Sequence, residues 1–386
     1  MQDIDEIPRN VDVAVIGAGI TGLSVAWHLA ERRAGSVAVF ERTGIGAEAS
    51  GVQPGGVRQQ WSMPVSCDLA KESVAFYLDV ADRLDATARP RLDRCGYLFV
   101  ADTAEMLATL EANVALQQGF GIPSRVVTPE EAASLVPGLR SEGMTGASWC
   151  AEDGYFDKPQ GVVEAFAEAV VRGGVPVVRG DVASIARRGS GWTLTLRGGG
   201  RVEAGAVVVA AGYGSPPIVS GLGFALPIRK EARYLFFGAP IEERLLEPLV
   251  VASERRFAAK QLADGRVLAS DLGADGDPES GRRHGRANVA RGIRSLLPQL
   301  EFVAFDLLVE GFYDVTPDHQ PILGPVDGHD GLWLAAGFSG HGFMMAPAVG
   351  RRLADAIVGG ALDPSLRELS IGRFGGRELQ HELQIV

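Results

Sequence analysis

Near the start of the chain, the pattern of apolar and polar positions predicts a strand, a helix and a second strand, in that order. Residues 13–22 form an apolar run that ends in Gly-x-Gly-x-x-Gly, and residues 23–31 are a helical stretch. A second apolar run at 36–40 is followed by Glu41. Because this glycine pattern between a strand and a helix is the βαβ fingerprint, the segment predicts a site for a nucleotide diphosphate.

Each glycine of the pattern has its own task in the predicted site. Gly17 permits the tight turn, Gly19 lets the backbone approach a pyrophosphate, and Gly22 lets the helix pack close to the strand. The helix N-terminus presents unpaired N–H groups and a positive dipole end to the phosphates. Glu41 stands where an acid accepts hydrogen bonds from the adenosine ribose. The alternative is a glycine-rich turn in an unrelated α/β protein.

Downstream, the pattern predicts helices around a strand. The helices are expected at 66–84, 104–118 and 159–172, and the strand at 96–101. Thr128, Pro129 and Glu131 predict another helix start, with Thr128 as N-cap and Glu131 closing a capping box.

Strand-like segments follow. They are expected at 176–182, 192–197, 206–210, 233–237, 250–253, 256–260 and 267–270, with a glycine turn at 198–200. Short strands alternating with polar turns between 228 and 308 predict an antiparallel sheet in a second domain. The glycine-rich segments 311–324 and 331–342 are expected to be loops, and a final amphipathic helix is expected at 346–359.

Composition narrows the class of protein. The 386 residues allow two domains, and 46% hydrophobic with 22% charged residues is ordinary for a soluble globular protein. The net charge of −11 argues against a nucleic-acid or anionic-membrane partner. Asp12, His28 and the glycines make the apolar stretch 11–30 a poor membrane span.

The location expected from these features is the cytoplasm. The first ten residues are acidic and polar, unlike a secretory signal. Cys67, Cys95 and Cys150 are far apart without a C-x-x-C, which favours reduced thiols.

A second apolar strand also points to the nucleotide site. Residues 207–212 read Val-Val-Val-Ala-Ala-Gly. In a doubly wound sheet such a strand leads to the ligand crevice. With the first pattern, it predicts a nucleotide domain assembled from distant pieces.

Four segments carry a resemblance to a known family. They are residues 13–42, the loop from Ala49-Ser50-Gly51 to Pro54-Gly55-Gly56-Val57-Arg58, the strands 177–182 and 207–212, and Tyr313-Asp314-Val315-Thr316-Pro317-Asp318 with Ala336-Gly337-Phe338-Ser339-Gly340-His341-Gly342-Phe343. They resemble the flavin amine-oxidoreductases that include D-amino acid oxidase, glycine oxidase and sarcosine oxidase. The resemblance covers nearly the whole chain. It is closest to the branch of the sarcosine oxidase β-subunit and dimethylglycine dehydrogenase.

The resemblance implies an α/β fold with two domains. One is a Rossmann-like FAD-binding domain of the glutathione-reductase type, expected at 1–85, 145–215 and 311–386. The other is a mixed-sheet substrate domain, expected at 86–144 and 216–310. FAD is implied rather than NAD, because the backbone N–H groups of residues 337–343 would stabilise negative charge on the reduced flavin. An NAD-dependent dehydrogenase is the disfavoured alternative.

The resemblance also implies the site residues. Those expected to bind FAD are Gly17, Ala18, Gly19, Ile20, Thr21, Gly22, Glu41, Arg42, Ala49, Ser50, Pro54, Gly55, Gly56, Val182, Ala211, Gly212, Gly337, Phe338, Gly340, His341, Gly342, Phe343 and Met344. Those expected in catalysis are Arg58, Tyr313, His341 and Met344. The ordinary alternatives are a solvated surface arginine, a core tyrosine and a structural histidine.

Departures from the family pattern change two expectations. Gly311 stands where monomeric sarcosine oxidase has a flavin-linked cysteine, and residues 47–50 lack the histidine of histidine-linked relatives. Non-covalent FAD is therefore expected. Met344 and Trp61 stand where relatives carry a lysine and an arginine that bind a substrate carboxylate. The pocket is therefore expected to contact an apolar or aromatic group of the substrate through Trp61, Tyr313 and Met344. The candidates for another cation that binds the carboxylate are Arg233, Arg255, Arg256 and Lys260.

The implied reaction is oxidation of the C–N bond of a secondary amine or substituted amino acid, with hydride passing to flavin N5. The expected partners are a small-molecule amine and an electron acceptor or partner subunit. Leu268 lies near the place of a lysine that speeds oxygen reduction in sarcosine oxidase, so slow oxygen reduction is expected unless Lys260 or Arg58 replaces it. The alternative is a non-catalytic flavin-binding subunit or assembly protein, which the missing clamps favour and the flavin loops oppose.

Overall fold

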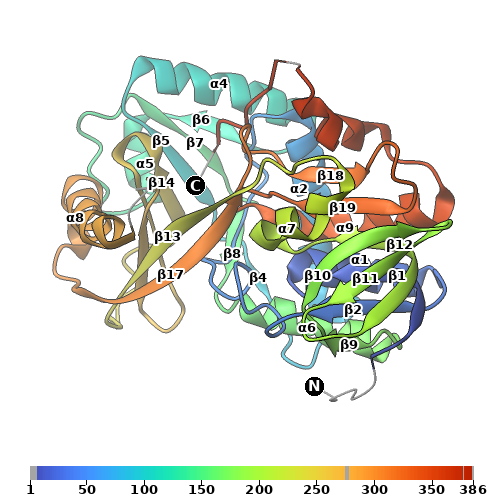
Figure 1. Cartoon of the computed structure of the whole chain (residues 1–386). Helices are drawn as coiled ribbons and strands as arrows, with labels where there is room; N and C mark the ends of the chain where they lie inside the picture. The colour runs from blue at the N-terminus through green and yellow to red at the C-terminus, as the bar shows by residue number, and fades with distance from the viewer. Residues whose placement is uncertain (1–6, 274–277, 377, 385–386) are drawn as a thin grey trace.

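The computed structural model describes residues 7–273, 278–376 and 378–384. Two large sheets form two halves of the molecule (Figure 1). The first sheet contains the expected parallel βαβ unit: β1 (Asn10–Ile16), α1 (Ile20–Glu31) and β2 (Val37–Glu41). The α/β fold class is thus confirmed.

Strands distant in the sequence complete the first sheet. β12 (Arg201–Val209) lies parallel to β1, and β19 (Leu332–Ala336) lies parallel to β12. The remaining strands are β18 (Ile322–Pro325), β9 (Val177–Arg179), β10 (Val182–Arg188) and β11 (Gly191–Leu196). The carboxyl ends of β1, β12 and β19 therefore meet at one edge, where a doubly wound sheet binds its ligand.

Two strand expectations need correction. The single strand expected at 176–182 is two, because after Arg179 the chain turns: Gly180 N–H donates to Glu41 O and Arg197 N–H to Asp181 O, and Val182 begins β10. The segment 311–324, expected to be a loop, contributes the end of β17 (Phe305–Val315) and most of β18.

Gly311 suggested a loop, but the close packing of Val52 explains why a glycine stands at this position of the strand. A Cβ at Gly311 would lie 2.9 Å from Cγ1 of Val52. Glycine within a strand can mark such a close approach rather than a loop. Segment 331–342 similarly contains β19 before the turn that leads into α9 (Gly342–Gly359), a helix that begins one turn earlier than expected.

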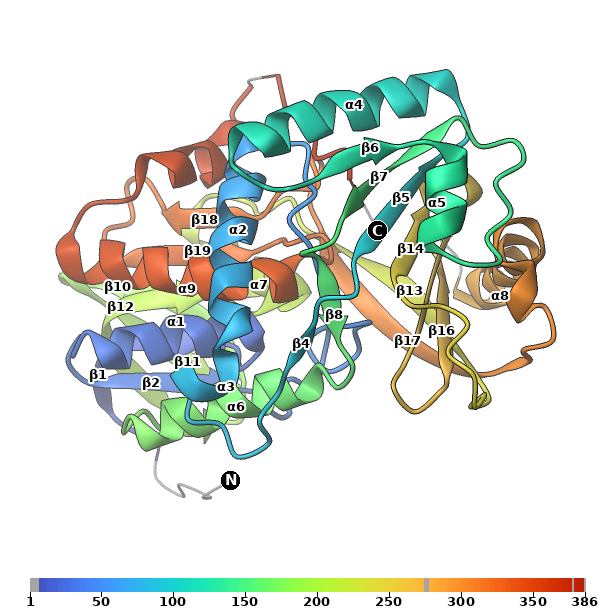
Figure 2. The ribbon, with the colours of Figure 1, turned by 180° about the vertical axis from the view of Figure 1, so that it is seen from behind.

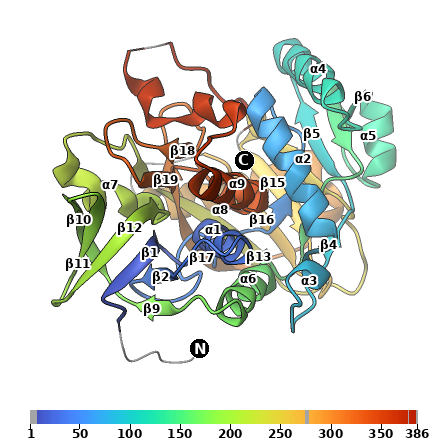
Figure 3. The same cartoon turned by 90° about the vertical axis from the view of Figure 1, so that its right-hand side faces the viewer.

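Helices cover one face of the first sheet (Figures 2 and 3). They are α1, α2 (Pro64–Leu78), α6 (Gln160–Arg172) and α9. A Cβ at Gly350 would lie 2.2 Å from Ser24 Oγ, so α9 packs closely on α1. The helix expected at 66–84 is divided at Asp79, after which α3 (Val80–Arg83) follows. The short helix α7 (Ser215–Val219) packs against β10 on the opposite side of the sheet.

The second sheet has the strand order β17-β13-β16-β15-β14-β5-β7-β6. Its further bounds are β13 (Arg229–Gly238), β16 (Val267–Asp271), β15 (Phe257–Gln261), β14 (Leu249–Ala252), β5 (Tyr97–Ala101), β7 (Gly146–Cys150) and β6 (Arg125–Val127). The four strands expected between 228 and 308 are present and antiparallel. β7 belongs to this sheet although it lies in the expected FAD-domain segment 145–215, because it pairs with β5.

Helices α4 (Ala104–Gly119), α5 (Pro129–Leu135) and α8 (Pro278–Leu296) pack on this sheet. The expected capping box at Thr128 and Glu131 is confirmed. Helix α8 was not expected, because its arginines and glycines suggest polar turns. Those glycines face aromatic rings: a Cβ at Gly292 would lie 2.3 Å from the ring of Phe257.

A small third sheet lies between the two halves. It consists of β3 (Gly56–Val57), β8 (Gly154–Phe156) and β4 (Leu92–Asp93). Short 3₁₀ turns lie at 212–214, 220–222, 253–255, 298–300, 364–369 and 371–374. Among the described helices, none combines the length and apolar character needed to cross a bilayer.

Candidate cofactor and substrate site

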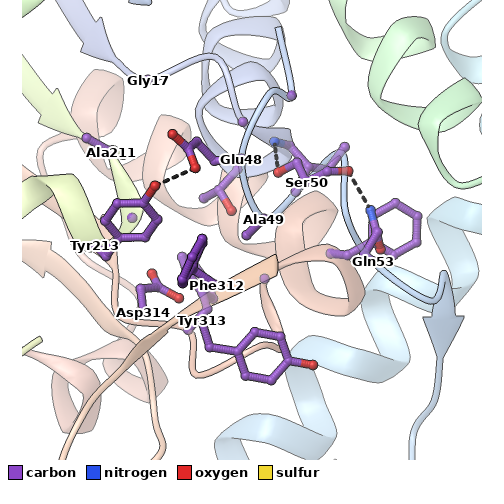
Figure 4. A pocket seen from close by; sticks show the side chains of 18 of the residues that line it. Gly17, Glu48, Ala49, Ser50, Gln53, Ala211, Tyr213, Phe312, Tyr313 and Asp314 are labelled. Atoms are coloured by element: carbon purple, nitrogen blue, oxygen red, sulfur yellow. Dashed lines mark hydrogen bonds between the residues drawn. The ribbon is translucent and has the colours of Figure 1, made fainter. Parts of the chain in front are cut away.

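A long cavity lies between the two large sheets. It has about 1860 Å³ of empty space, its open mouth included. Its wall begins at the turn after β1, continues along residues 44–54 and the end of β12, and reaches β17, the start of α9 and the inner face of the second sheet. Figure 4 shows the part of this wall from Gly17 to Asp314. Both halves of the molecule therefore contribute to one site.

The turn after β1 requires glycine at two positions. Gly17 has a φ of +109°, and a Cβ there would lie 2.4 Å from Ala210 O. A Cβ at Gly22 would lie 2.0 Å from Gly17 O, so α1 begins in direct contact with the turn. Gly19 is the N-cap of α1, and Ser50 Oγ accepts a hydrogen bond of 3.0 Å from Ile20 N–H. The helix N-terminus thus opens onto the cavity beside a hydroxyl group.

Glu41, at the end of β2, is held by backbone donors. Its carboxylate accepts hydrogen bonds from Ala18 N–H at 2.9 Å and from Thr43 N–H at 2.8 Å. These contacts fix the carboxylate on the cavity wall next to the glycine turn. A fixed acceptor beside a helix N-terminus suits the ribose and pyrophosphate of a dinucleotide.

Charged and aromatic side chains surround the adjoining rim. Arg42 pairs with Glu48 at 2.7 Å. Tyr213 O–H donates a hydrogen bond to the same carboxylate, as Figure 4 shows. Burial is the main cause that raises the pKa of Tyr213 to about 12. From the second half of the molecule, the Lys230 ammonium lies 4.4 Å from the ring centroid of Tyr213 and 3.7 Å from that of Phe312. This cluster joins the two halves at the rim.

Asp314, at the end of β17, holds the turn that precedes α9. Its carboxylate accepts a hydrogen bond of 2.7 Å from Gly337 N–H, and its carbonyl accepts one from Ser339 N–H. Burial raises the pKa of Asp314 to about 6. Asp314 belongs to the motif of residues 313–318, but no role was predicted for it. The signal that could have identified it is an acid at the end of a strand.

Four expected residues at the start of α9 line the cavity: His341, Gly342, Phe343 and Met344. The ring of His341 meets the ring of Trp61 edge-on, with 4.6 Å between centroids. Burial lowers the pKa of His341 well below its ordinary value, so the imidazole is neutral at physiological pH. The site therefore offers a neutral ring here, not a cation.

Arg58 and Trp61 lie behind the cavity wall. Both side chains are fully buried, and neither lines the cavity. The Arg58 guanidinium lies 3.7 Å from the ring centroid of Trp61 and donates to the carbonyls of Gln60 and Gln384. Arg58 is therefore not a solvated surface residue. The expectation that Trp61 contacts the substrate is wrong, because its buried ring does not line the cavity.

Most of the residues expected at the site line the cavity, and the rest lie outside its lining. Those that line the cavity are Gly17, Gly19, Ile20, Thr21, Glu41, Arg42, Ala49, Ser50, Pro54, Gly56, Val182, Ala211, Gly212, Tyr313, Phe338, Gly340, His341, Gly342, Phe343 and Met344. Those just outside its lining are Ala18, Gly22, Gly55, Arg58 and Gly337.

The second sheet forms the roof of the cavity. Alternate side chains of its strands line it, namely Tyr97, Leu249, Ala258, Lys260, Leu268 and Ser270. Tyr97 and Ser270 were not expected, because their strands reach this wall only through long-range pairing. Three of these six side chains are apolar, namely Leu249, Ala258 and Leu268, and a ligand beneath them is shielded from water.

The fold and the cavity together define a dinucleotide-binding α/β protein, in which the glycine turn and the N-terminus of α1 suit a diphosphate. A family model described as "FAD dependent oxidoreductase" matches residues 12–356, so the chain belongs to this family. FAD is its cofactor. The glycine turn, the α1 N-terminus and the room in the cavity fit that group.

Individual relatives span nearly the whole chain. FAD-dependent oxidoreductase domain-containing protein 1 of Bos taurus is 28% identical over 92% of this chain and 82% of its own length. A glycine oxidase of Geobacillus kaustophilus is 28% identical over 90% of this chain and 92% of its own. The crystal structure of L-proline dehydrogenase from P. horikoshii is similar at a TM-score of 0.88 and 27% identity, over 97% of this chain and 100% of that one.

Proposed function

We propose that the protein oxidises the C–N bond of a secondary amine or substituted amino acid. The observation that carries the proposal is the continuous cavity from the dinucleotide turn to the roof formed by the second sheet. The likeness to L-proline dehydrogenase and glycine oxidase supports it. When bound, FAD supplies the acceptor for the hydride that leaves the α-carbon of the amine.

In this proposal, the two ends of the cavity have separate tasks. Gly19, Ser50 and Glu41 hold the ADP half of the cofactor, and residues 337–343 approach the flavin with their backbone. Leu268 and Met344 exclude water from the amine, whose neutral form must reach the reacting position. The protein positions and desolvates its substrate rather than supplying an essential acid or base.

The second candidate is a flavin-binding subunit or assembly protein without turnover. It is favoured by Met344, which stands where relatives carry a lysine. The partner subunit, the electron acceptor and the cytoplasmic location stay predictions. Reduction of the bound flavin by a substrate, rather than by light, separates the two candidates.

We expect FAD to be bound tightly but without a covalent link. Of the described residues that line the cavity, none is a cysteine, and Gly311 offers no nucleophile. After acid precipitation the yellow colour should remain in the supernatant. Colour that stays with the protein pellet contradicts this expectation.

We expect N-substituted amines with an apolar group to be better substrates than glycine or sarcosine. Leu249, Leu268 and Met344 line the cavity and favour a larger apolar group by roughly tenfold or more, which is the discrimination of a hydrophobic pocket for added methylene groups. The measurement is the rate of flavin bleaching without oxygen across a panel of amines. Bleaching by sarcosine or glycine as fast as by the larger amines refutes this selectivity.

A further inference from the structure

Met344 and Trp61 stand where relatives carry the cations that bind a substrate carboxylate. Four other cations were candidates for this role, and the structure distinguishes among them. Arg255 donates to both carboxylate oxygens of Asp102, at 2.6 and 2.7 Å. Arg256 pairs with Asp271 at 3.1 Å. Both pairs leave their guanidinium groups engaged away from the cavity.

Arg233 is also engaged. It forms an ion pair of 2.8 Å with Glu231, and its guanidinium lies 4.8 Å from the ring centroid of Tyr313. The ring of Tyr313 lines the cavity, whereas Arg233 does not. Its charge is thus balanced within its own strand.

Lys260 differs from these three. Its side chain is fully buried and lines the cavity, and its Nζ has no hydrogen-bond partner among the described residues. The nitrogen lies 3.8 Å from the ring centroid of Tyr155. A buried ammonium group that makes no hydrogen bond to an anion is unfavourable, so a ligand that brings a carboxylate would stabilise it.

The environment of Lys260 fits that reading. Burial is the main cause that lowers its pKa to about 7, and the charged groups that act on it are Asp157, Asp93 and Arg244, with the Cys95 thiol. Tyr155 is itself held, since its O–H donates to Gln261 O at 2.6 Å and accepts from Arg244 at 2.8 Å. A fixed aromatic ring restricts where the ammonium group lies.

The strand register places Lys260 beside Leu268 in the roof of the cavity. Lys260 is the cross-strand partner of Leu268, the position where the resemblance had suggested a missing lysine. Both side chains line the same wall, beside Ala258 and Leu249. A cation therefore reaches this wall from β15 although β16 presents leucine.

We propose that Lys260 binds the carboxylate of the substrate, which makes the substrate an N-substituted amino acid rather than a simple amine. The inference rests on the proposed function. The Lys260 ammonium donates hydrogen bonds to the carboxylate, and when the free lysine is neutral it takes one proton from solvent on binding. No covalent bond forms or breaks in this step.

Ligand binding tests this directly, without turnover. FAD-loaded protein is titrated with acetate against acetamide and with benzoate against benzamide, while the visible flavin spectrum is followed. The wild type should bind each carboxylate about ten- to hundredfold more tightly than its amide, the range of a charge-assisted hydrogen bond. Lys260→Met should abolish the preference, and Lys260→Arg should keep part of it. The control Lys158→Met removes an exposed lysine of the same charge and should behave as wild type.

A carboxylate preference that survives in Lys260→Met overturns the inference, as does a wild type without the preference. If Lys260→Met slows only the reaction of reduced flavin with oxygen, the lysine acts on oxygen and the inference is also wrong. If carboxylates bind through Lys260 but no amine bleaches the flavin, the inference stands and the proposed function fails.

Discussion

Replacement of Gly22 by alanine is expected to yield a protein that is destabilised and has lost most of its FAD. The new Cβ would lie 2.0 Å from Gly17 O, which is a backbone atom and cannot rotate away. Helix α1 must therefore shift from the turn that it supports. Overpacking of this kind destabilises a fold by roughly 3 kcal/mol, and the shifted turn no longer presents its N–H groups to the pyrophosphate.

The measurements for Gly22→Ala are urea unfolding and the ratio of flavin to protein after purification. The matched control is Gly119→Ala, which also introduces a methyl group in a helix, but where a Cβ has no atom within 4 Å. That control should keep its FAD and be equal to or about 0.5–1 kcal/mol more stable than the wild type. A Gly22→Ala protein with full flavin content contradicts the role assigned to the turn.

Replacement of Asp314 by alanine is expected to weaken both the fold and the flavin end of the site. The variant leaves Gly337 N–H buried without its acceptor, which destabilises by about 2 kcal/mol. The turn at 337–340 then loses its attachment to β17. FAD should be retained less well, because this turn lines the cavity through Phe338 and Gly340.

The Asp314 variant also has a predicted pH dependence. Burial raises the pKa of the carboxyl from 3.8 to about 6, so the folded state binds the extra proton between these values. The stability of the wild type therefore falls relative to that of the variant as pH rises from about 4 to about 6. Asp306→Ala, an exposed change on the same strand, is the control and should show neither effect. Equal stability profiles for Asp314→Ala and Asp306→Ala refute this account of the turn.

Local features of the fold were predictable from the sequence. The βαβ unit depends on residues that are neighbours in the chain, so its strand–helix–strand order could be predicted, and Gly17 and Gly22 make the close approaches expected of them. The capping box at Thr128 and Glu131 is likewise complete within four consecutive positions. Such signals need no knowledge of strand pairing.

Long-range features were not predictable. Helix α8 was missed because glycines weaken a helix pattern, and only the packed structure shows that Gly292 accommodates the ring of Phe257. Trp61 was expected in the pocket, but its position behind the wall follows from the burial of Arg58 beside it. Lys260 could not be selected among four cations until the ion pairs of the other three were known.

The most direct test of the central claim, oxidation of a C–N bond in this cavity, is anaerobic mixing of the FAD-loaded protein with N-substituted amino acids. The account predicts that the visible absorption of the flavin bleaches and that a carbonyl compound and a shorter amine are released. If every amine leaves the flavin oxidised while light still reduces it, the site binds flavin without turnover, and the claim is contradicted.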